Sequence, residues 1–446
     1  MATPNGIRQR NTSSKSKPTY DPLDIGAGAT PKAPSQDSFE HPAGPIKHGP
    51  LTQILRAFVS LSWFLSTCII IHINQFVGAP LYLYSKPLYY AWQSLAKQSF
   101  AIILIQLTNW FAPTVIRVSW DASCRGQLTK AKDNSGRLET RFPERMILMS
   151  NHQIYTDWIY LWWLSYTSRC HGAIFIILKD SLRWIPLLGW GMMFYGFIFM
   201  SRKWETDKPR LAHRLAQLKK RYMGPGQPGA QIGAEGLKSA GMDPMWLLIF
   251  PEGTNLSANT RKKSVAWSEK SGLKDMKHLL LPRSTGMFFC LNELADTIDY
   301  VYDCTVAYEG VPHGGYAQDY FSLRSTFLQG RPPKSVNFHW RRFKVSDIPL
   351  QDQDAFQLWV TQRWREKDEL IETYVQTGRF PADVEDGKSA DDGYIETGVQ
   401  LRSWSELVQP YVIVLTLLLL GNIVRRFWQQ FMTRKPPSPP YQCDDL

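Results

Sequence analysis

Two long apolar runs near the ends of the chain constrain its fold more than any other feature. Residues 54–77 form the first run and residues 408–424 the second, and each approaches the roughly 20 residues needed to cross a bilayer as a helix. The second is followed by Arg425 and Arg426, a basic flank that the positive-inside rule places in the cytosol. A single crossing there would put the preceding acidic segment in the lumen. An amphipathic or re-entrant anchor that never crosses fits equally well.

A third apolar stretch, residues 100–118, is interrupted by Pro113 and carries Trp110, with Trp120 just beyond it. Proline shortens a helix, and tryptophan favours the membrane interface. We therefore expect this stretch to return the chain across the membrane or to lie flat on its surface.

The segment between the anchors alternates short apolar runs with amphipathic stretches, which is typical of an α/β domain. The amphipathic stretches 208–221 and 354–374 are charged and predict helices. The apolar runs are four to seven residues long, as expected for buried strands. These predicted strands are residues 146–149, 174–177, 197–200, 246–250 and 300–306.

Composition shifts divide the chain into a series of segments. The first 50 residues are rich in Pro, Gly, Ser and Thr and too poor in aliphatic residues to offset the entropy of ordering, so they predict a disordered tail. We therefore expect a tail (1–50), N-terminal membrane segments (51–118), an α/β domain (119–380), an acidic linker (381–406), a C-terminal membrane anchor (407–432) and a second tail (433–446).

The charge of the chain favours anionic partners. Its 446 residues include 51 Lys and Arg against 39 Asp and Glu, a net charge of +12, which suits nucleic acid, an acidic membrane face or a phosphate-rich cofactor without choosing among them. The six cysteines are widely spaced and form no Cys-x-x-Cys pair, which argues against a zinc site or a disulfide framework.

The sharpest chemical signal follows the first predicted strand. His152 leaves this strand, and Asp157 comes five residues later at the start of an apolar helix, with Thr156 as its expected N-cap. A loop at His152 folds the imidazole back towards the carboxylate. Such a pair forms a general base that can take a proton from a hydroxyl. Because no Gly-x-Ser-x-Gly nucleophile is present, we expect the hydroxyl to belong to the substrate.

A second turn follows the strand at residues 246–250. Pro251 and Gly253 are expected to form a rigid turn that presents Glu252 and the N–H groups of Gly253 and Thr254 to an anionic or polyol group. An ordinary turn at the end of a strand is the alternative.

Two further segments carry cations. Arg202 and Lys203 follow the strand at 197–200 and suit a phosphate, although pairing with nearby acids on a solvated helix is the simpler expectation. Arg283 lies in a second basic turn, residues 281–286.

Taken in order, these motifs resemble the membrane-bound glycerolipid acyltransferases of the 1-acylglycerol-3-phosphate acyltransferase type. The resemblance covers residues 145–374 and includes Asn-His-x4-Asp, a Phe-Ile-x-x-Arg type of segment and Phe-Pro-Glu-Gly-Thr. The segments 202–204, 248–254, 281–286 and 302–308 are most similar to the lysocardiolipin acyltransferase-like branch.

The resemblance implies an acyl-CoA-dependent O-acyltransferase. His152 would deprotonate the free hydroxyl of a lysophospholipid, and Asp157 would orient the imidazole. Arg202, Glu252 and Gly253 would position the glycerophosphate. Acyl-CoA, lysophospholipid and membrane lipids are the implied partners, with neither a metal nor a resident cofactor nor nucleic acid. The basic run 261–263 suits the phosphates of CoA.

One departure from the family concerns the acceptor. Enzymes dedicated to lysophosphatidic acid usually carry Arg after Glu-Gly-Thr, whereas this chain has Asn255. An amide lacks the charge that suits a phosphate monoester. Lysophosphatidylinositol, lysophosphatidylglycerol or lysocardiolipin are therefore the favoured acceptors, although Arg202 and Arg283 can supply the missing charge.

Other functions remain open at this point. The same fold can use glycerol-3-phosphate or exchange acyl chains between lipids without CoA, and a non-catalytic membrane adaptor would need only the basic surface. For an enzyme, the expected location is the endoplasmic reticulum membrane with the site facing the cytosol, where acyl-CoA is made.

Overall fold

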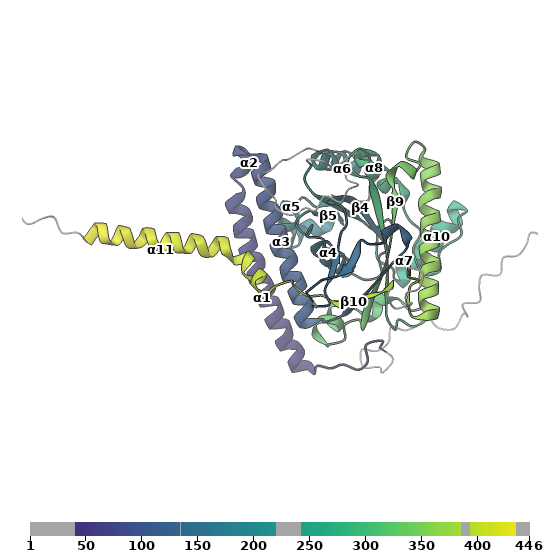
Figure 1. Ribbon diagram of the computed structural model, residues 1–446, viewed down its shortest axis with the longest axis horizontal. Coiled ribbons are helices and arrows are strands. Elements are labelled where there is room, and N and C mark those ends of the chain that lie inside the picture. The colour runs from purple at the N-terminus through teal and green to yellow at the C-terminus, as the bar shows by residue number, and fades with distance from the viewer. Residues whose placement is uncertain (1–40, 134, 220–241, 385–392, 434–446) are drawn as a thin grey trace, which may run out of the picture.

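One mixed sheet of eight strands forms the centre of the molecule in the computed structural model, which describes residues 41–133, 135–219, 242–384 and 393–433 (Figure 1). The strand order is β10-β1-β9-β8-β4-β7-β5-β6. A separate hairpin pairs β2 with β3. The strands are β1 (Val115–Trp120), β2 (Leu128–Lys130), β3 (Leu138–Thr140), β4 (Arg145–Ser150), β5 (Ile174–Lys179), β6 (Ile198–Met200), β7 (Met245–Ile249), β8 (Tyr300–Tyr308), β9 (Ser335–Lys344) and β10 (Ile395–Gly398).

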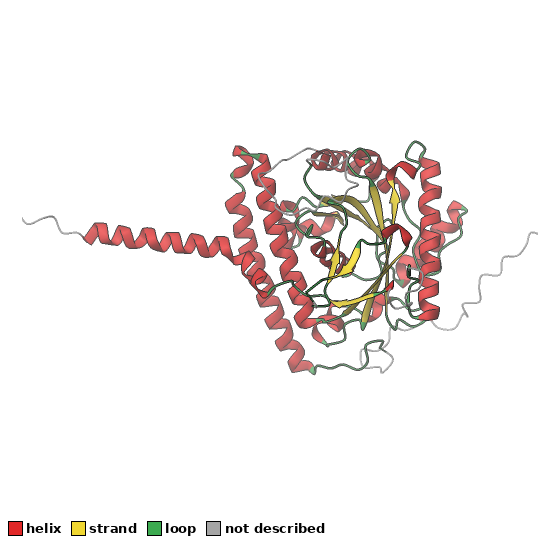
Figure 2. Ribbon diagram, viewed as in Figure 1, coloured by secondary structure: helices red, strands yellow, loops and turns green. Residues whose placement is uncertain are grey.

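Helices cover both faces of this sheet (Figure 2). They are α1 (Pro50–Gly78), α2 (Leu81–Tyr84), α3 (Lys86–Phe111), α4 (Asp157–Thr167), α5 (Leu188–Phe194), α6 (Trp204–Lys219), α7 (Ala258–Ser271), α8 (Ser284–Leu294), α9 (Ala317–Tyr320), α10 (Gln353–Thr377) and α11 (Val412–Thr433). Shorter helical turns are η1 (Ala122–Cys124), η2 (Asp180–Trp184), η3 (Arg324–Leu328), η4 (Val345–Asp347) and η6 (Trp404–Tyr411).

The central strand β4 contributes to two hydrophobic cores because successive side chains of a strand point to opposite faces. Met146 and Leu148 join the core that includes buried residues of α3 and α4. Ile147 and Met149 join the core that includes buried residues of α6, α8 and α10. The chain therefore forms a three-layer α/β/α domain, as the alternation of apolar runs predicts.

The five predicted strands are all present, as β4 to β8. They form one parallel block, β8-β4-β7-β5-β6, in which β4 lies between β8 and β7. Strand β9 then runs antiparallel to β8, and β1 runs parallel to β9. The carboxyl ends of the parallel strands therefore share one edge of the sheet.

The stretch 100–118 does not lie flat on the molecular surface, which was one of its two expected placements. Ile102, Ile103 and Ile105 are each only 1% exposed in α3, where they pack within the domain, and residues from Val115 onward form β1. The stretch is apolar because it lies in the core, and a core helix and a membrane helix produce the same local pattern.

Two apolar helices long enough to cross a membrane lie near the chain ends, at Pro50–Tyr84 and Trp404–Gln429. The first packs beside α3, and the second projects away from the domain (Figure 1). Leu51, Leu55 and Phe58 belong to an exposed apolar stripe along α1, whereas its Thr67 and Gln75 are fully buried. The helix is therefore held to the domain by one face and leaves an apolar face outward.

The expected boundaries of the tail and the linker differ from the structure. Residues 1–40 lie outside the described part, but His41 is buried and its Nε2 lies 3.0 Å from the carbonyl oxygen of Tyr320. In the acidic segment 381–406, residues 395–398 form β10, and Glu396 accepts a 2.5 Å hydrogen bond from Arg117 Nε. This segment is acidic partly because it pairs with cations of the domain.

Candidate active site

The polar motifs meet at the carboxyl edge of the parallel strands. His152 follows β4, Glu252 follows the adjacent β7, and Tyr308 ends β8 on the other side of β4. In open α/β sheets this edge is where ligands bind. The sheet topology therefore brings together residues that are up to 156 positions apart in the chain.

His152 and Asp157 form the predicted pair. The Nδ1 atom of His152 lies 2.8 Å from Oδ2 of Asp157, which begins α4. The side chain of His152 is 18% exposed, whereas that of Asp157 is fully buried. A carboxylate at Nδ1 accepts a hydrogen bond from the Nδ1–H group, which leaves the lone pair of Nε2 free to accept a proton. The catalytic role of the pair stays a prediction.

The Asp157 carboxylate is held from several sides. Its Oδ2 atom also accepts the backbone N–H groups of Gln153 at 2.6 Å and Ile154 at 3.0 Å, and its Oδ1 accepts the hydroxyl of Tyr308. Thr156 is the N-cap residue of α4, as predicted, but its side chain makes no capping hydrogen bond. Asp157 itself binds the N–H groups of the preceding turn.

Phe250 links the β7 turn to the histidine. Its ring stacks on the imidazole of His152 at 4.4 Å between centroids, and the N–H of Leu256 donates to the His152 carbonyl at 2.8 Å. These contacts fix the imidazole plane. Phe250 therefore covers one face of the imidazole ring.

Glu252 turns inward instead of being presented to a ligand. It is 2% exposed, and burial raises the pKa of its carboxyl to about 8. The indole of Trp364, the backbone N–H of His152 and the Lys367 ammonium lower this pKa in part, but neither carboxyl oxygen has a partner at hydrogen-bond geometry among the described residues. The turn is tight because Gly253 adopts a φ of 70° and donates its N–H to Phe250.

The structure brings the two predicted arginines to this turn. Arg202 donates from Nη2 to the carbonyl of Gly253 at 2.8 Å, and the backbone N–H of Arg283 donates to Pro251 at 2.8 Å. A side chain on Gly253 would meet Cδ of Arg283 at 3.8 Å. Both arginines are exposed. They place two cations beside the Glu-Gly turn, where an anionic group has access to them.

The simpler expectation for the segment after β6 was that Arg202 and Lys203 pair with acids on the next helix. The side chain of Asp207 on that helix instead binds Ser201. Its Oδ1 accepts the backbone N–H and the hydroxyl of Ser201, at 2.8 and 2.9 Å. Asp207 thus fixes the turn that carries Arg202, whose φ of 68° is unusual for a residue with a side chain.

Asn255 was predicted to contact the acceptor, but it is largely buried. It is 9% exposed, and its Nδ2 donates to Oε1 of Gln318 at 3.4 Å. The same oxygen accepts the N–H of Tyr155 at 2.6 Å. Gln318 therefore connects the His152 loop to the Glu-Gly loop, while Thr254 beside Asn255 stays half-buried.

The basic run 261–263 lies in α7, not in a loop. Arg261 donates to the carbonyls of Met276 at 2.8 Å and Leu279 at 2.6 Å and pairs with Asp275. Its guanidinium therefore stabilises the following loop. Lys262 and Lys263 are exposed and remain available to an anion.

Sequence reasoning did not assign roles to Tyr308, Gln318 or the ring of Phe250. The position of Tyr308 as the last residue of a strand parallel to β4 was a usable signal. Nothing in the sequence pairs Gln318 with loops more than 60 residues away.

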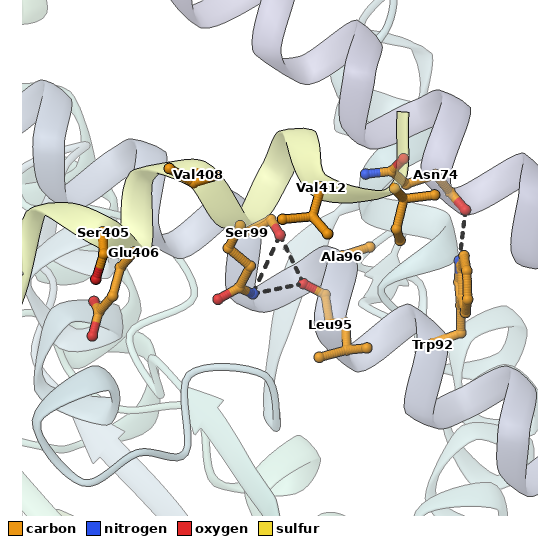
Figure 3. Close-up of a pocket in the computed structure, with 11 residues that line it drawn as sticks. Asn74, Trp92, Leu95, Ala96, Ser99, Ser405, Glu406, Val408 and Val412 are labelled. Atoms are coloured by element: carbon orange, nitrogen blue, oxygen red, sulfur yellow. Dashed lines mark hydrogen bonds between the residues drawn. The ribbon is translucent and has the colours of Figure 1, made fainter. Parts of the chain in front are cut away.

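A cavity of about 510 Å³ lies elsewhere, between the terminal helices (Figure 3). It is lined by residues of α3, η6 and α11, six of them apolar, and by Asn74 of α1. Gln409 reaches across it towards Ser99, with 3.4 Å between Nε2 and Oγ. None of its lining residues belongs to the His152 or Glu252 loops.

Comparison with known proteins identifies two family regions. A family model described as acyltransferase matches residues 133–309, and one described as acyltransferase C-terminus matches residues 326–403. No solved structure matches the chain.

Three curated relatives illustrate the similarity. An uncharacterised acyltransferase of Schizosaccharomyces pombe is 35% identical over 80% of this chain and 93% of its own length. The 2-acyl-1-lysophosphatidylinositol acyltransferase of Saccharomyces cerevisiae is 37% identical over 81% of this chain and 94% of its own length. Lysocardiolipin acyltransferase 1 of Gallus gallus is 33% identical over 53% and 55%. The chain therefore belongs to the glycerolipid acyltransferase family and is an acyltransferase.

Proposed function

We propose that the protein transfers an acyl chain from acyl-CoA to the free hydroxyl of a lysophospholipid that carries a headgroup. The observation that carries this proposal is the His152–Asp157 pair, at 2.8 Å, in which the His152 side chain is 18% exposed at the carboxyl end of β4. Membership of an enzyme family removes the reason to consider a non-catalytic adaptor.

In the proposed reaction, Nε2 of His152 takes the proton of the lysolipid hydroxyl as its oxygen attacks the thioester carbonyl. The buried Asp157 carboxylate stabilises the imidazolium that forms. Collapse of the tetrahedral intermediate breaks the carbon–sulfur bond, and the imidazolium proton goes to the departing thiolate. The products are the diacyl lipid and CoA, and no acyl-enzyme is required.

The two exposed arginines beside Gly253 provide the anion-binding part of the site. Arg202 is anchored to the Gly253 carbonyl and Arg283 borders the same turn, so we assign them to the phosphate of the acceptor. Lys262 and Lys263 lie on the outer surface of α7 and suit the phosphates of CoA.

Lysophosphatidylinositol is the acceptor we favour. The yeast relative that matches 94% of its own length is named for this activity, and Asn255 removes the cation that a phosphate monoester would use. Lysocardiolipin and lysophosphatidylglycerol have the same phosphodiester chemistry and are the competing acceptors.

For location, we propose the endoplasmic reticulum membrane with His152 facing the cytosol. The two apolar helices support membrane attachment. A glycosylation acceptor inserted at the exposed turn by Lys132 and Asp133 should remain unmodified, because glycans are added in the lumen and this site is proposed to face the cytosol. Glycan addition at the turn would place the site in the lumen.

The central test is His152→Ala with release of the CoA thiol as the readout. Loss of a general base typically costs about 10²–10⁴-fold in turnover. His213→Ala is the matched control because His213 is exposed on α6 and contacts only its own helix neighbour Gln217 among the described residues. Activity of His152→Ala within a few-fold of wild type would refute the assignment. Acyl exchange without CoA release would refute the proposed donor.

A further inference from the structure

We infer that Tyr308 is a positioning residue for the catalytic pair. Its hydroxyl binds the second carboxylate oxygen of Asp157 and thereby sets the pH range in which His152 accepts a proton. The role of Tyr308 in catalysis rests on the proposed function, whereas the contacts behind the inference involve only the side chains of Tyr308, Asp157 and His152. It adds β8 to the elements that build the site.

The two oxygens of Asp157 have different partners. Oδ2 accepts from Nδ1 of His152 and from the two backbone N–H groups of the loop. Oδ1 accepts from the hydroxyl of Tyr308. Because Asp157 is fully buried, loss of the tyrosine hydroxyl would leave Oδ1 as a desolvated acceptor without a donor.

The side chain of Tyr308 is buried and fixed by its neighbours. It is 4% exposed at the end of β8, pairs in register with Val336 of β9, and its ring packs 5.8 Å from that of Phe321. Burial and the nearby Asp157 raise the pKa of Tyr308 well above its usual value. The hydroxyl therefore stays protonated and donating throughout the working range of the enzyme.

The direction of the effect follows from charge. A hydrogen bond donated to a carboxylate disperses its negative charge, so Asp157 attracts an imidazolium less strongly with Tyr308 than without it. Removing the hydroxyl should make His152 hold its proton to higher pH. The other titratable groups that face this cluster are unchanged by the substitution; they are Tyr160 of α4, Cys304 of β8, Glu252 after β7 and Lys367 of α10.

The test compares Tyr308→Phe with Tyr302→Phe. Both tyrosines lie on β8 and are buried, but the hydroxyl of Tyr302 donates to Gln127 at 2.9 Å, away from Asp157. The readout is the rate at which diethyl pyrocarbonate modifies His152, followed by peptide mass spectrometry as a function of pH. The reagent reacts with the unprotonated imidazole, so the readout does not depend on acyl transfer.

We expect the midpoint of His152 modification to rise by about half a pH unit or more in Tyr308→Phe and to stay at the wild-type value in Tyr302→Phe. The acidic limb of kcat/KM should move by the same amount. Superimposable profiles for wild type and Tyr308→Phe overturn the inference. A shifted modification profile in an enzyme that transfers no acyl chain to any lysolipid supports the role of Tyr308 and refutes the proposed function instead.

If Tyr308→Phe does not fold, the same comparison is made with Asp157→Asn. An amide no longer attracts the imidazolium as a charge, so the midpoint of His152 modification should fall below that of wild type. An unchanged midpoint there overturns the coupling from which the role of Tyr308 is inferred.

Discussion

Replacing Glu252 by Gln should stabilise the protein at neutral pH even though it alters a buried residue beside the site. The carboxyl of Glu252 is 2% exposed, and its pKa is raised from 4.5 to about 8, chiefly by burial. Between pH 4.5 and about pH 8, Glu252 keeps its proton in the folded chain and releases it in the unfolded chain. The stability of the wild type therefore falls as pH rises through this window.

The magnitude follows from the difference between the two pKa values. Each unit corresponds to about 1.4 kcal/mol, so the raised pKa of this carboxyl lowers the free energy of unfolding by about 3 kcal/mol at pH 7 and by up to about 5 kcal/mol above pH 8. Glutamine has nearly the same shape and carries no titrating proton. The variant should gain most of this difference at pH 7 and none of it near pH 4.

The assay is thermal unfolding of the detergent-purified protein between pH 4 and pH 9. We expect the melting temperature of Glu252→Gln to exceed that of wild type by a few degrees at pH 7, with a gap that closes as the pH falls. Glu269→Gln, at an exposed position on α7, is the control and should show no such trend. A pH-independent difference between Glu252→Gln and wild type would refute the reasoning.

Three other outcomes are expected. Lys367→Met should destabilise the fold by about 3–5 kcal/mol, measured by unfolding, because Lys367 and Asp303 are both fully buried and paired at 2.6 Å; unchanged stability would contradict this. Asn255→Arg should move the kcat/KM ratio towards lysophosphatidic acid, and Gln318→Ala, which breaks the same link without adding charge, should not; an unchanged ratio for Asn255→Arg would refute the argument. Deleting the chain from residue 412 onward should leave the melting temperature near that of wild type while weakening vesicle binding, because the apolar window of the last span is only 6% buried; a large fall in melting temperature would show that α11 supports the domain.

The parallel half of the sheet was predictable because its strands are short apolar runs. Strand β9 was not predicted because Asn337, His339 and Arg341 alternate with apolar residues, as in a half-buried strand, so it lacks the continuous apolar run by which the other strands were predicted. Their partners are remote: Arg341 pairs with Asp303 at 2.8 Å, and Asn337 donates to the hydroxyl of Tyr374 at 2.9 Å. Polar residues satisfied by distant partners leave no local signal of burial.

The candidate site likewise has one part that was predictable from the sequence and one part that was not. The approach of His152 to Asp157 was predictable because a strand end, a loop and a helix start lie within the eight residues 150–157. The inward turn of Glu252 was not, because its direction depends on how β7 and α10 pack, and the hydroxyl on Oδ1 of Asp157 comes from a residue 151 positions away.

The meeting of both chain ends on the same surface has a consequence for biosynthesis. Strand β1 pairs with β9 and β10, about 220 and 280 residues further along the chain, and the hydroxyl of Thr67 in α1 lies 2.8 Å from that of Tyr411. A chain made from its N-terminus forms the first apolar helix long before these partners leave the ribosome. The edge of β1 and the buried face of α1 therefore stay exposed until the chain has been synthesised past Tyr411, and during that time the membrane or chaperones must cover them.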